Sequence, residues 1–87
     1  MIFEHKTLPE FWECYNALPD GVQRRADKQF ARLSEDPLHS SVHLKSVGEF
    51  WSARVTGAYR ALAVRHGNVF IWFWIGSHDE YSQMLKG

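Results

Sequence analysis

The sequence has little cysteine, no net charge and no long apolar run. Its 87 residues include one cysteine, Cys14, so no internal disulfide can form and a disulfide scaffold is excluded. Ten Lys and Arg balance ten Asp and Glu, so no overall field attracts the chain to nucleic acid or acidic lipid. The longest apolar run, residues 69–75, is far shorter than the roughly 20 residues of a membrane helix. We expect a single soluble domain over residues 1–87, cytoplasmic and without a membrane partner.

Aromatic residues, in contrast, are plentiful at 15% of the chain. Each ring buries a large apolar area, so a chain of this length can build one core without a disulfide or a structural metal. His39 and His43 are spaced as metal ligands on a helix, but they follow a proline and lead into a predicted strand. Cys14 borders an apolar stripe and has no basic neighbour in sequence, which favours a buried, inert thiol. We expect no metal and no cofactor.

The N-terminal part of the chain predicts one strand and two helices. Apolar and polar residues alternate over residues 2–6, which is typical of a short strand. Apolar residues at helical spacing then predict a helix over residues 8–18, capped by Thr7, and a second helix over residues 22–33. The apolar stripe of the second helix consists of Val22, Ala26, Phe30 and Leu33.

From residue 43 onward the apolar period changes to two. Turns at Gly48-Glu49, Gly57-Ala58 and Gly67-Asn68 separate four such runs, which predicts a meander of four antiparallel strands. The predicted fold class is α+β, in the order β-α-α-β-β-β-β-α. Two N-terminal helices pack on one face of an antiparallel sheet, and a short helix ends the chain.

One face of the predicted sheet should remain open, because antiparallel sheets commonly cover one face and leave the other to water. On the strand over residues 50–56, Trp51, Ala53 and Val55 share the face that we assign to the core. The opposite face carries Phe50, Ser52, Arg54 and Thr56. Arg60 joins Arg54 on this open face if the intervening turn keeps the register.

The segment SHDEY, residues 77–81, combines helix-start signals with one unexplained side chain. Ser77 and Glu80 form the pattern of a capping box, and Asp79 suits the positive end of the helix dipole. Tyr81 can be the first apolar contact of the last helix. His78 has no such structural task, and a protonated imidazole would oppose the dipole. It is therefore a candidate for function.

The arginines have two interpretations. Taken alone, Arg54 and Arg60 are ordinary cations on a solvated sheet face, where they contribute little to stability. Together with Lys45, His78 and Tyr81 at one end of that face, they provide a phosphate clamp and titratable groups in one place.

Residues 43–64, HLKSVGEFWSARVTGAYRALAV, followed by residues 75–81, IGSHDEY, resemble the RelE/ParE superfamily of toxins from bacterial toxin–antitoxin pairs. The resemblance extends over nearly the whole chain. It implies a compact microbial RNase-type fold and a cognate antitoxin that covers the basic sheet face. RelE-like members cut mRNA in the ribosome, whereas ParE-like members poison DNA gyrase and lack a nuclease site.

The resemblance also implies site residues. Arg60 and Tyr81 match an arginine and a tyrosine that serve cleavage in RelE-like members, and His78 stands where members carry Arg or His. The lysines that precede this arginine in RelE itself fall at Phe50 and Ser52 here. The expected catalytic residues are Arg60, His78, Tyr81 and Arg54, and the expected RNA-binding residues are Lys45, Arg65 and Ser52.

The function expected from this resemblance is a ribosome-dependent mRNA endonuclease. RNA carries its own nucleophile, the 2′-hydroxyl, so the protein needs an arginine clamp with help from histidine and tyrosine, and no metal. The expected partners are the ribosome, mRNA and the antitoxin. Two alternatives stay open: a gyrase poison of the ParE kind, and a degenerate toxin that only binds its antitoxin.

Overall fold

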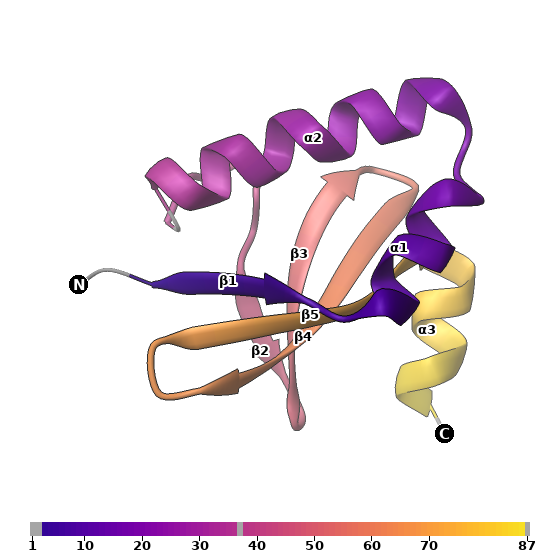
Figure 1. Cartoon of the computed structure of the whole chain (residues 1–87). Helices are drawn as coiled ribbons and strands as arrows, with labels where there is room; N and C mark the ends of the chain where they lie inside the picture. The colour runs from indigo at the N-terminus through magenta and orange to yellow at the C-terminus, as the bar shows by residue number, and fades with distance from the viewer. Residues whose placement is uncertain (1–2, 37, 87) are drawn as a thin grey trace.

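The computed structural model describes residues 3–36 and 38–86 and has the predicted α+β order of elements (Figure 1). In these ranges no helix is both long enough and apolar enough to cross a membrane. The elements in chain order are β1 (Glu4–Thr7), α1 (Pro9–Asn16), α2 (Asp20–Glu35), β2 (Lys45–Val47), β3 (Phe50–Thr56), β4 (Tyr59–His66), β5 (Val69–Ser77) and α3 (His78–Lys86).

The strands form one five-stranded sheet in the order β1-β5-β4-β3-β2. The meander from β2 to β5 is antiparallel, as predicted. β1, however, lies at the edge parallel to β5, with Lys6 opposite Ile71, so the sheet is mixed rather than antiparallel. Parallel neighbours need a long connection, and here α1, α2 and the rest of the meander supply it. Alternation in the sequence indicates a strand but not the direction of its partner.

The first strand also differs from its prediction in bounds and in its last residue. It covers Glu4–Thr7 instead of residues 2–6, and residue 2 lies outside the described part of the chain. Thr7 does not cap α1, because Leu8 occupies the N-cap position without a side-chain hydrogen bond. Instead, the Thr7 hydroxyl oxygen accepts a hydrogen bond of 2.9 Å from the indole Nε1 of Trp12.

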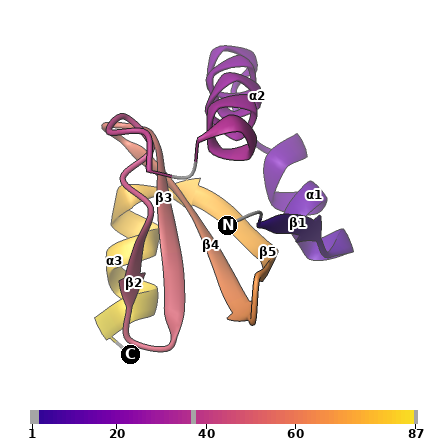
Figure 2. The ribbon, with the colours of Figure 1, turned by 90° about the vertical axis from the view of Figure 1, so that its left-hand side faces the viewer.

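The helices lie on both sides of the sheet: α1 and α2 on one side, α3 on the other (Figure 2). α1 packs against β5, and α2 packs against β3. Ala53 and Val55 face this helical layer as predicted, and Trp51 packs at its margin. The core cluster between the helices and the sheet consists of Phe11, Leu18, Ala26, Leu33, Val42, Ala53, Val55, Ala61, Ala63, Phe70, Trp72 and Ile75.

One predicted core position on α2 is wrong. Phe30 is 44% exposed, whereas the neighbouring Gln29 is only 8% exposed. The amide of Gln29 donates hydrogen bonds of 2.9 Å to the carbonyls of Ser41 and Arg54. The register of β3 shifts just after Arg54, so this carbonyl lies next to an irregularity of the ladder. A buried glutamine satisfies it better than an apolar ring, because an unpaired buried carbonyl is costly.

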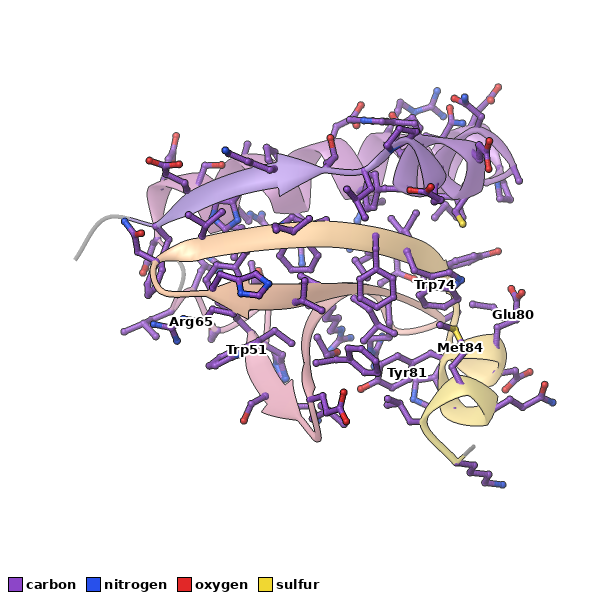
Figure 3. The ribbon with its side chains drawn as sticks, turned by 60° about the horizontal axis from the view of Figure 1, so that its bottom comes forward. Trp51, Arg65, Trp74, Glu80, Tyr81 and Met84 are labelled. Carbon is purple, nitrogen blue, oxygen red and sulfur yellow. The ribbon has the colours of Figure 1, made fainter. Side chains whose placement is uncertain are left out.

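The second face of the sheet is not an open wet face along its whole length. Ser52 is 1% exposed and Leu62 is fully buried. α3 folds back over β4 and β5, and Tyr81 and Met84 lie beside Trp74 at this end, while Arg65 lies at the opposite end (Figure 3). The prediction failed because the sequence does not show where the last helix docks.

The packing of Trp74 predicts a specific effect at Gly76. A Cβ added at Gly76 would lie 2.5 Å from the Trp74 indole, so the ring must shift. We expect Gly76→Ala to lower the free energy of unfolding by about 1–3 kcal/mol, the usual cost of overpacking. The matched control is Gly21→Ala, where a Cβ meets nothing within 4 Å and should stabilise α2 by up to about 1 kcal/mol. Urea denaturation measures both values. Equal effects of the two substitutions would contradict the packing described here.

Candidate functional site

Two arginines face each other across the hairpin of β3 and β4. Arg54 and Arg60 are directly opposite in the ladder, and the alternation of the strands puts them on the face that carries α3. The Arg60 guanidinium donates hydrogen bonds of 2.5 Å and 2.9 Å to the carbonyls of Thr56 and Tyr59. The Arg54 guanidinium reaches the same turn, because a Cβ on Gly57 would lie 3.8 Å from its Nη2. Both cations therefore lie beside the β3–β4 turn.

The neighbours of Arg60 act on its pKa in opposite directions. Burial lowers the pKa of Arg60 from its ordinary value, and the positive charge of Arg54 lowers it further. Tyr81 acts in the opposite direction and raises the pKa of Arg60. Like charges directly opposite in a sheet are destabilising. An anion bound between the two guanidiniums would remove this repulsion.

His78 lies at the same end of the sheet. Its backbone N–H donates a 2.7 Å hydrogen bond to the carbonyl of Ala58, which ties the start of α3 to the β3–β4 turn. The ladder leads to the same placement, because Arg60 is opposite Gly76, two residues before His78. The His78 side chain is exposed, and its ring centroid is 5.5 Å from that of Tyr81. The structure thus places Arg54, Arg60, His78 and Tyr81 at one end of the sheet. The sequence predicted this grouping for an unbroken register, whereas here the register shifts between Arg54 and Thr56 and this shift puts Arg60 opposite Arg54.

A hollow of about 390 Å³ opens between this turn and the start of α3. Arg54 and Arg60 are on the two strands that lead into and out of the turn. No motif in the sequence marks this turn as a wall of the site. Its contact with the last helix appears only in the hydrogen bond from the His78 N–H to the Ala58 carbonyl. The lining residues are Gly57, Ala58, Tyr59, Ser77, His78 and Asp79.

The predicted capping box at the start of α3 is present, with one difference. The N–H of Glu80 donates to the Ser77 hydroxyl at 3.2 Å, and this hydroxyl donates to the Glu80 carboxylate at 3.1 Å. The glutamate therefore accepts from the serine side chain. Because the N–H groups of His78 and Glu80 already have partners, an anion in the hollow would depend on the guanidiniums rather than on these two amides.

Tyr81 is the most buried of the predicted catalytic residues. It is 8% exposed, and its ring packs between α3 and the sheet. Both interpretations of this tyrosine therefore apply to its position, since it is an apolar contact of α3 and also a neighbour of Arg60 and His78. Its contacts suit a residue that orients the imidazole.

The three predicted RNA-binding residues are in very different places. Lys45 is exposed on β2 and pairs with Ser52, so it shares the face of Arg54. The side chain of Ser52 is buried and is not available to a ligand. Ser52 does share the face of Arg54 on β3, as predicted. However, both Ser52 and Leu62, which lies opposite it on β4, are buried, so this part of the face is closed to solvent.

Arg65 lies at the far end of β4, away from the hollow (Figure 3). Its guanidinium is 5.0 Å from the ring centroid of Phe3 and 5.2 Å from that of Trp51. Its Nε donates a 2.7 Å hydrogen bond to the carbonyl of Gly67. Arg65 is opposite the buried Phe70, so it is on the helical side of the sheet. The structure places Arg65 away from this site, because five residues separate it from Arg60 on β4 and it therefore points to the other face, where aromatic rings surround its guanidinium.

A second cavity, of about 330 Å³, separates the two N-terminal helices from the sheet. Its walls are mainly apolar and include Phe11, Trp12 and Phe30. It lies on the helical side of the sheet, so it does not contact the hollow beside His78. We regard it as incomplete packing between α2 and β1 rather than as part of the candidate site.

His5 lines this second cavity and gives the fold a dependence on pH. Its Nδ1 accepts a 3.1 Å hydrogen bond from the Trp72 indole, and burial lowers the pKa of His5 below its ordinary value of 6.5. The unfolded chain therefore takes up this proton at a higher pH than the folded chain. The stability from the neutral ring is complete above pH 6.5 and is lost as the pH falls toward the folded pKa.

This dependence predicts a loss of stability in acid that His5→Asn reduces. The asparagine oxygen can accept from Trp72, but it does not titrate in this range. Urea denaturation at about pH 7.5 and about pH 5.5 gives the difference in unfolding free energy for each protein. We expect a smaller difference for the variant than for the wild type. An identical difference would mean that His5 does not carry the effect.

The other candidate ligands and nucleophiles do not form a centre. Among residues 3–36 and 38–86, no group of three or more His, Cys, Asp or Glu side chains is placed to hold a metal ion. Nδ1 of His39 lies 2.8 Å from the Ser41 hydroxyl, in a local turn. Cys14 is half-buried against the core cluster.

Comparison with known proteins identifies the family. Residues 20–83, well over half of the chain and including all of the hollow, match the family model described as a ParE-like toxin domain. The chain belongs to this family. It is thus a toxin of the RelE/ParE superfamily, as the motifs of residues 43–64 and 75–81 predicted. No protein with a curated description matches the sequence.

Solved structures of this superfamily share the fold of this ParE-like toxin at low sequence identity. The chain aligns with the RelB–RelE antitoxin–toxin complex from Methanococcus jannaschii at a TM-score of 0.72 and 12% identity, over 91% of this chain and 96% of that one. A mutant of the E. coli toxin RelE in the free state gives 0.65 and 15%, over 99% and 97%. A YoeB/ParE toxin from Agrobacterium tumefaciens gives 0.65 and 13%, over 87% and 99%. These matches confirm the α+β fold.

Proposed function

We propose that this ParE-like toxin is an mRNA endonuclease that acts on ribosome-bound message. The observation that carries the proposal is the cross-strand pair Arg54 and Arg60 beside a hollow on whose rim the exposed His78 lies. The three groups come from two strands and a helix start, and all lie at the β3–β4 turn. Two guanidiniums beside the turn and an imidazole on the rim of the hollow fit a phosphodiester and the proton transfers of its cleavage.

The reaction needs little from the protein, because the RNA 2′-hydroxyl is the nucleophile. His78 removes its proton, the 2′-oxygen bonds to the adjacent phosphorus, and the bond from phosphorus to the 5′-oxygen breaks. That oxygen takes up a proton, which leaves a 2′,3′-cyclic phosphate and a 5′-hydroxyl. Arg60 and Arg54 neutralise the additional negative charge of the pentavalent transition state. Tyr81, packed beside both His78 and Arg60, orients the imidazole.

The proposal extends to two kinds of partner. The chain has equal numbers of cationic and anionic side chains, so we propose that the ribosome supplies positioning that a basic nuclease would obtain from its own charge. Several structural neighbours were solved as complexes of RelE with the antitoxin RelB. We propose a cognate antitoxin that covers the face with Arg54 and Arg60.

A second function, gyrase poisoning without hydrolysis, is favoured by the description of the matching family as ParE-like. The absence of net charge also suits a protein target better than RNA. The exposed His78 on the hollow favours the nuclease, because a poison that acts only by binding has no use for a titratable group at that point.

Induced expression in a bacterial host distinguishes the two functions. The nuclease predicts arrest of translation with mRNA cuts at codon-periodic positions, mapped by primer extension. DNA breaks and an SOS response with intact mRNA would show gyrase poisoning instead. A wild-type protein that neither cuts mRNA nor breaks DNA, and still binds its antitoxin, would establish the degenerate alternative.

A further inference from the structure

An aromatic pair, defined here as Phe50 and Phe73, is present on the sheet face that carries the arginines. The two ring centroids are 5.4 Å apart, and the planes are tilted by 53°. Phe50 begins β3, and Phe73 lies in β5, so the pair bridges β4. Neither ring belongs to the core cluster between the helices and the sheet.

The position of the pair relative to Arg54 follows from the strand. Phe50, Ser52 and Arg54 alternate on one face of β3 without a register shift between them. At about 3.3 Å per residue, Phe50 is roughly 13 Å along the strand from Arg54. Ser52 and Leu62 lie between them on the same face and are buried. α3 packs on β4 and β5 at the arginine end, and both rings are only half-buried.

The charges around the aromatic pair select the kind of ligand. Lys45 lies on the neighbouring strand opposite Ser52, and Arg54 and Arg60 follow toward the turn. The face thus has two aromatic rings at one end and two guanidiniums at the other, with an exposed lysine between them. Single-stranded nucleic acid has the complementary pattern of planar bases and anionic phosphates, because aromatic side chains stack on bases while cations follow the backbone.

We infer that the aromatic pair is a base-binding subsite for single-stranded RNA. The chain that enters the hollow with its scissile phosphate extends along β3 past Lys45, and a nucleobase a few nucleotides away stacks on the surface formed by Phe50 and Phe73. This inference rests on the proposed function. It explains how a toxin without net positive charge holds RNA, since stacking replaces part of the electrostatic attraction.

Direct binding of a short RNA tests the subsite separately from cleavage. The ligand is a hexanucleotide with 2′-O-methyl groups throughout, which has no nucleophile. A series of otherwise identical hexanucleotides each lacks the base at one position. Fluorescence anisotropy gives the dissociation constants. We expect wild type to bind one abasic oligonucleotide about tenfold more weakly than the intact one, the typical effect of losing one stacked base.

Variants of the pair locate this effect. Phe50→Leu and Phe73→Leu keep an apolar side chain but remove the ring, and each should lose the difference between the intact and abasic oligonucleotides. Phe50→Trp keeps an aromatic ring at this position, so it should retain the difference that Phe50→Leu loses. A purely structural role of Phe50 does not predict this result. The matched control is Phe30→Leu, a half-exposed ring on α2 at the other side of the sheet. It should bind as the wild type does.

The outcomes separate this inference from the nuclease. Unchanged binding of both oligonucleotides by the folded leucine variants would overturn the subsite, whatever the cleavage assays show. Base-dependent binding without mRNA cuts in cells would keep the subsite and contradict the nuclease. A wild-type protein with no affinity for the oligonucleotide would overturn the subsite even if cleavage on the ribosome is observed.

Discussion

Arg60→Ala is expected to reduce the rate of mRNA cleavage on the ribosome by about 10²–10³-fold, the usual cost of one transition-state donor. The guanidinium is held beside the turn by the carbonyls of Thr56 and Tyr59, so it is already in place when the phosphate enters. Single-turnover cleavage of a programmed ribosome in a purified translation system measures this rate directly. The loss should be in the chemical step, because Arg54 still attracts the phosphate.

Two further variants show whether the effect belongs to the site. Arg60→Lys keeps the charge but loses the fork that contacts two oxygens, so its rate should fall between those of wild type and Arg60→Ala. Arg25→Ala removes an exposed cation from α2, on the other side of the sheet, and should leave the rate within about twofold. A rate for the folded Arg60→Ala protein that equals the control would remove Arg60 from the mechanism.

His78→Gly is expected to lower the cleavage rate by about 10²–10⁴-fold, the contribution of a positioned general base or acid. The side chain is exposed and its backbone, not its ring, is bonded to Ala58, so the substitution should leave the fold intact. Free imidazole added to the reaction should restore part of the rate, because it fits the space of the missing ring. The same single-turnover assay applies, with thermal unfolding as the check on folding.

His66→Gly is the matched control for this prediction. His66 is also exposed, but it lies at the end of β4 that is away from the hollow. Its removal should change neither the rate nor the response to imidazole. Full activity of His78→Gly would mean that another group moves the proton, and loss of activity without imidazole rescue would indicate a structural role.

The fold was predictable where local patterns decide it. Period-two alternation and glycine turns gave the four strands of the meander with the correct order, and the capping box gave the start of α3 at His78. The pairing of β1 was not predictable, because its partner strand is more than 60 residues away and either edge of the meander satisfies its apolar pattern. Gln29 replaces Phe30 in the core for a reason that appears only in the tertiary structure, the irregular ladder at Arg54.

The candidate site was predictable in its members more than in its register. A two-residue turn that pairs Thr56 with Tyr59 would place Arg60 opposite Val55 in a regular ladder, and the register shift after Arg54 places it opposite Arg54 instead. The position of His78 follows from the adjacent strand end. The burial of Ser52 needed knowledge of packing. The placement of Arg65 did not, because it is five residues from Arg60 on β4 and alternation puts it on the other face, where its guanidinium contacts three aromatic rings. Alternation along a strand indicates on which face of the sheet a side chain lies, but it does not show what covers that face.

The central claim, that Arg54, Arg60 and His78 surround one phosphodiester, is tested most directly by an NMR titration of the toxin with a non-cleavable dinucleotide, 2′-O-methyl-uridylyl-uridine. The guanidinium Nε–H signals of both arginines and the imidazole signals of His78 serve as the readout. The structure predicts that all three move along the titration with one shared dissociation constant, while the signals of Arg65 and His66 stay unchanged. Separate dissociation constants for the arginines and the histidine, or movement of the arginines alone, would contradict a single phosphate site.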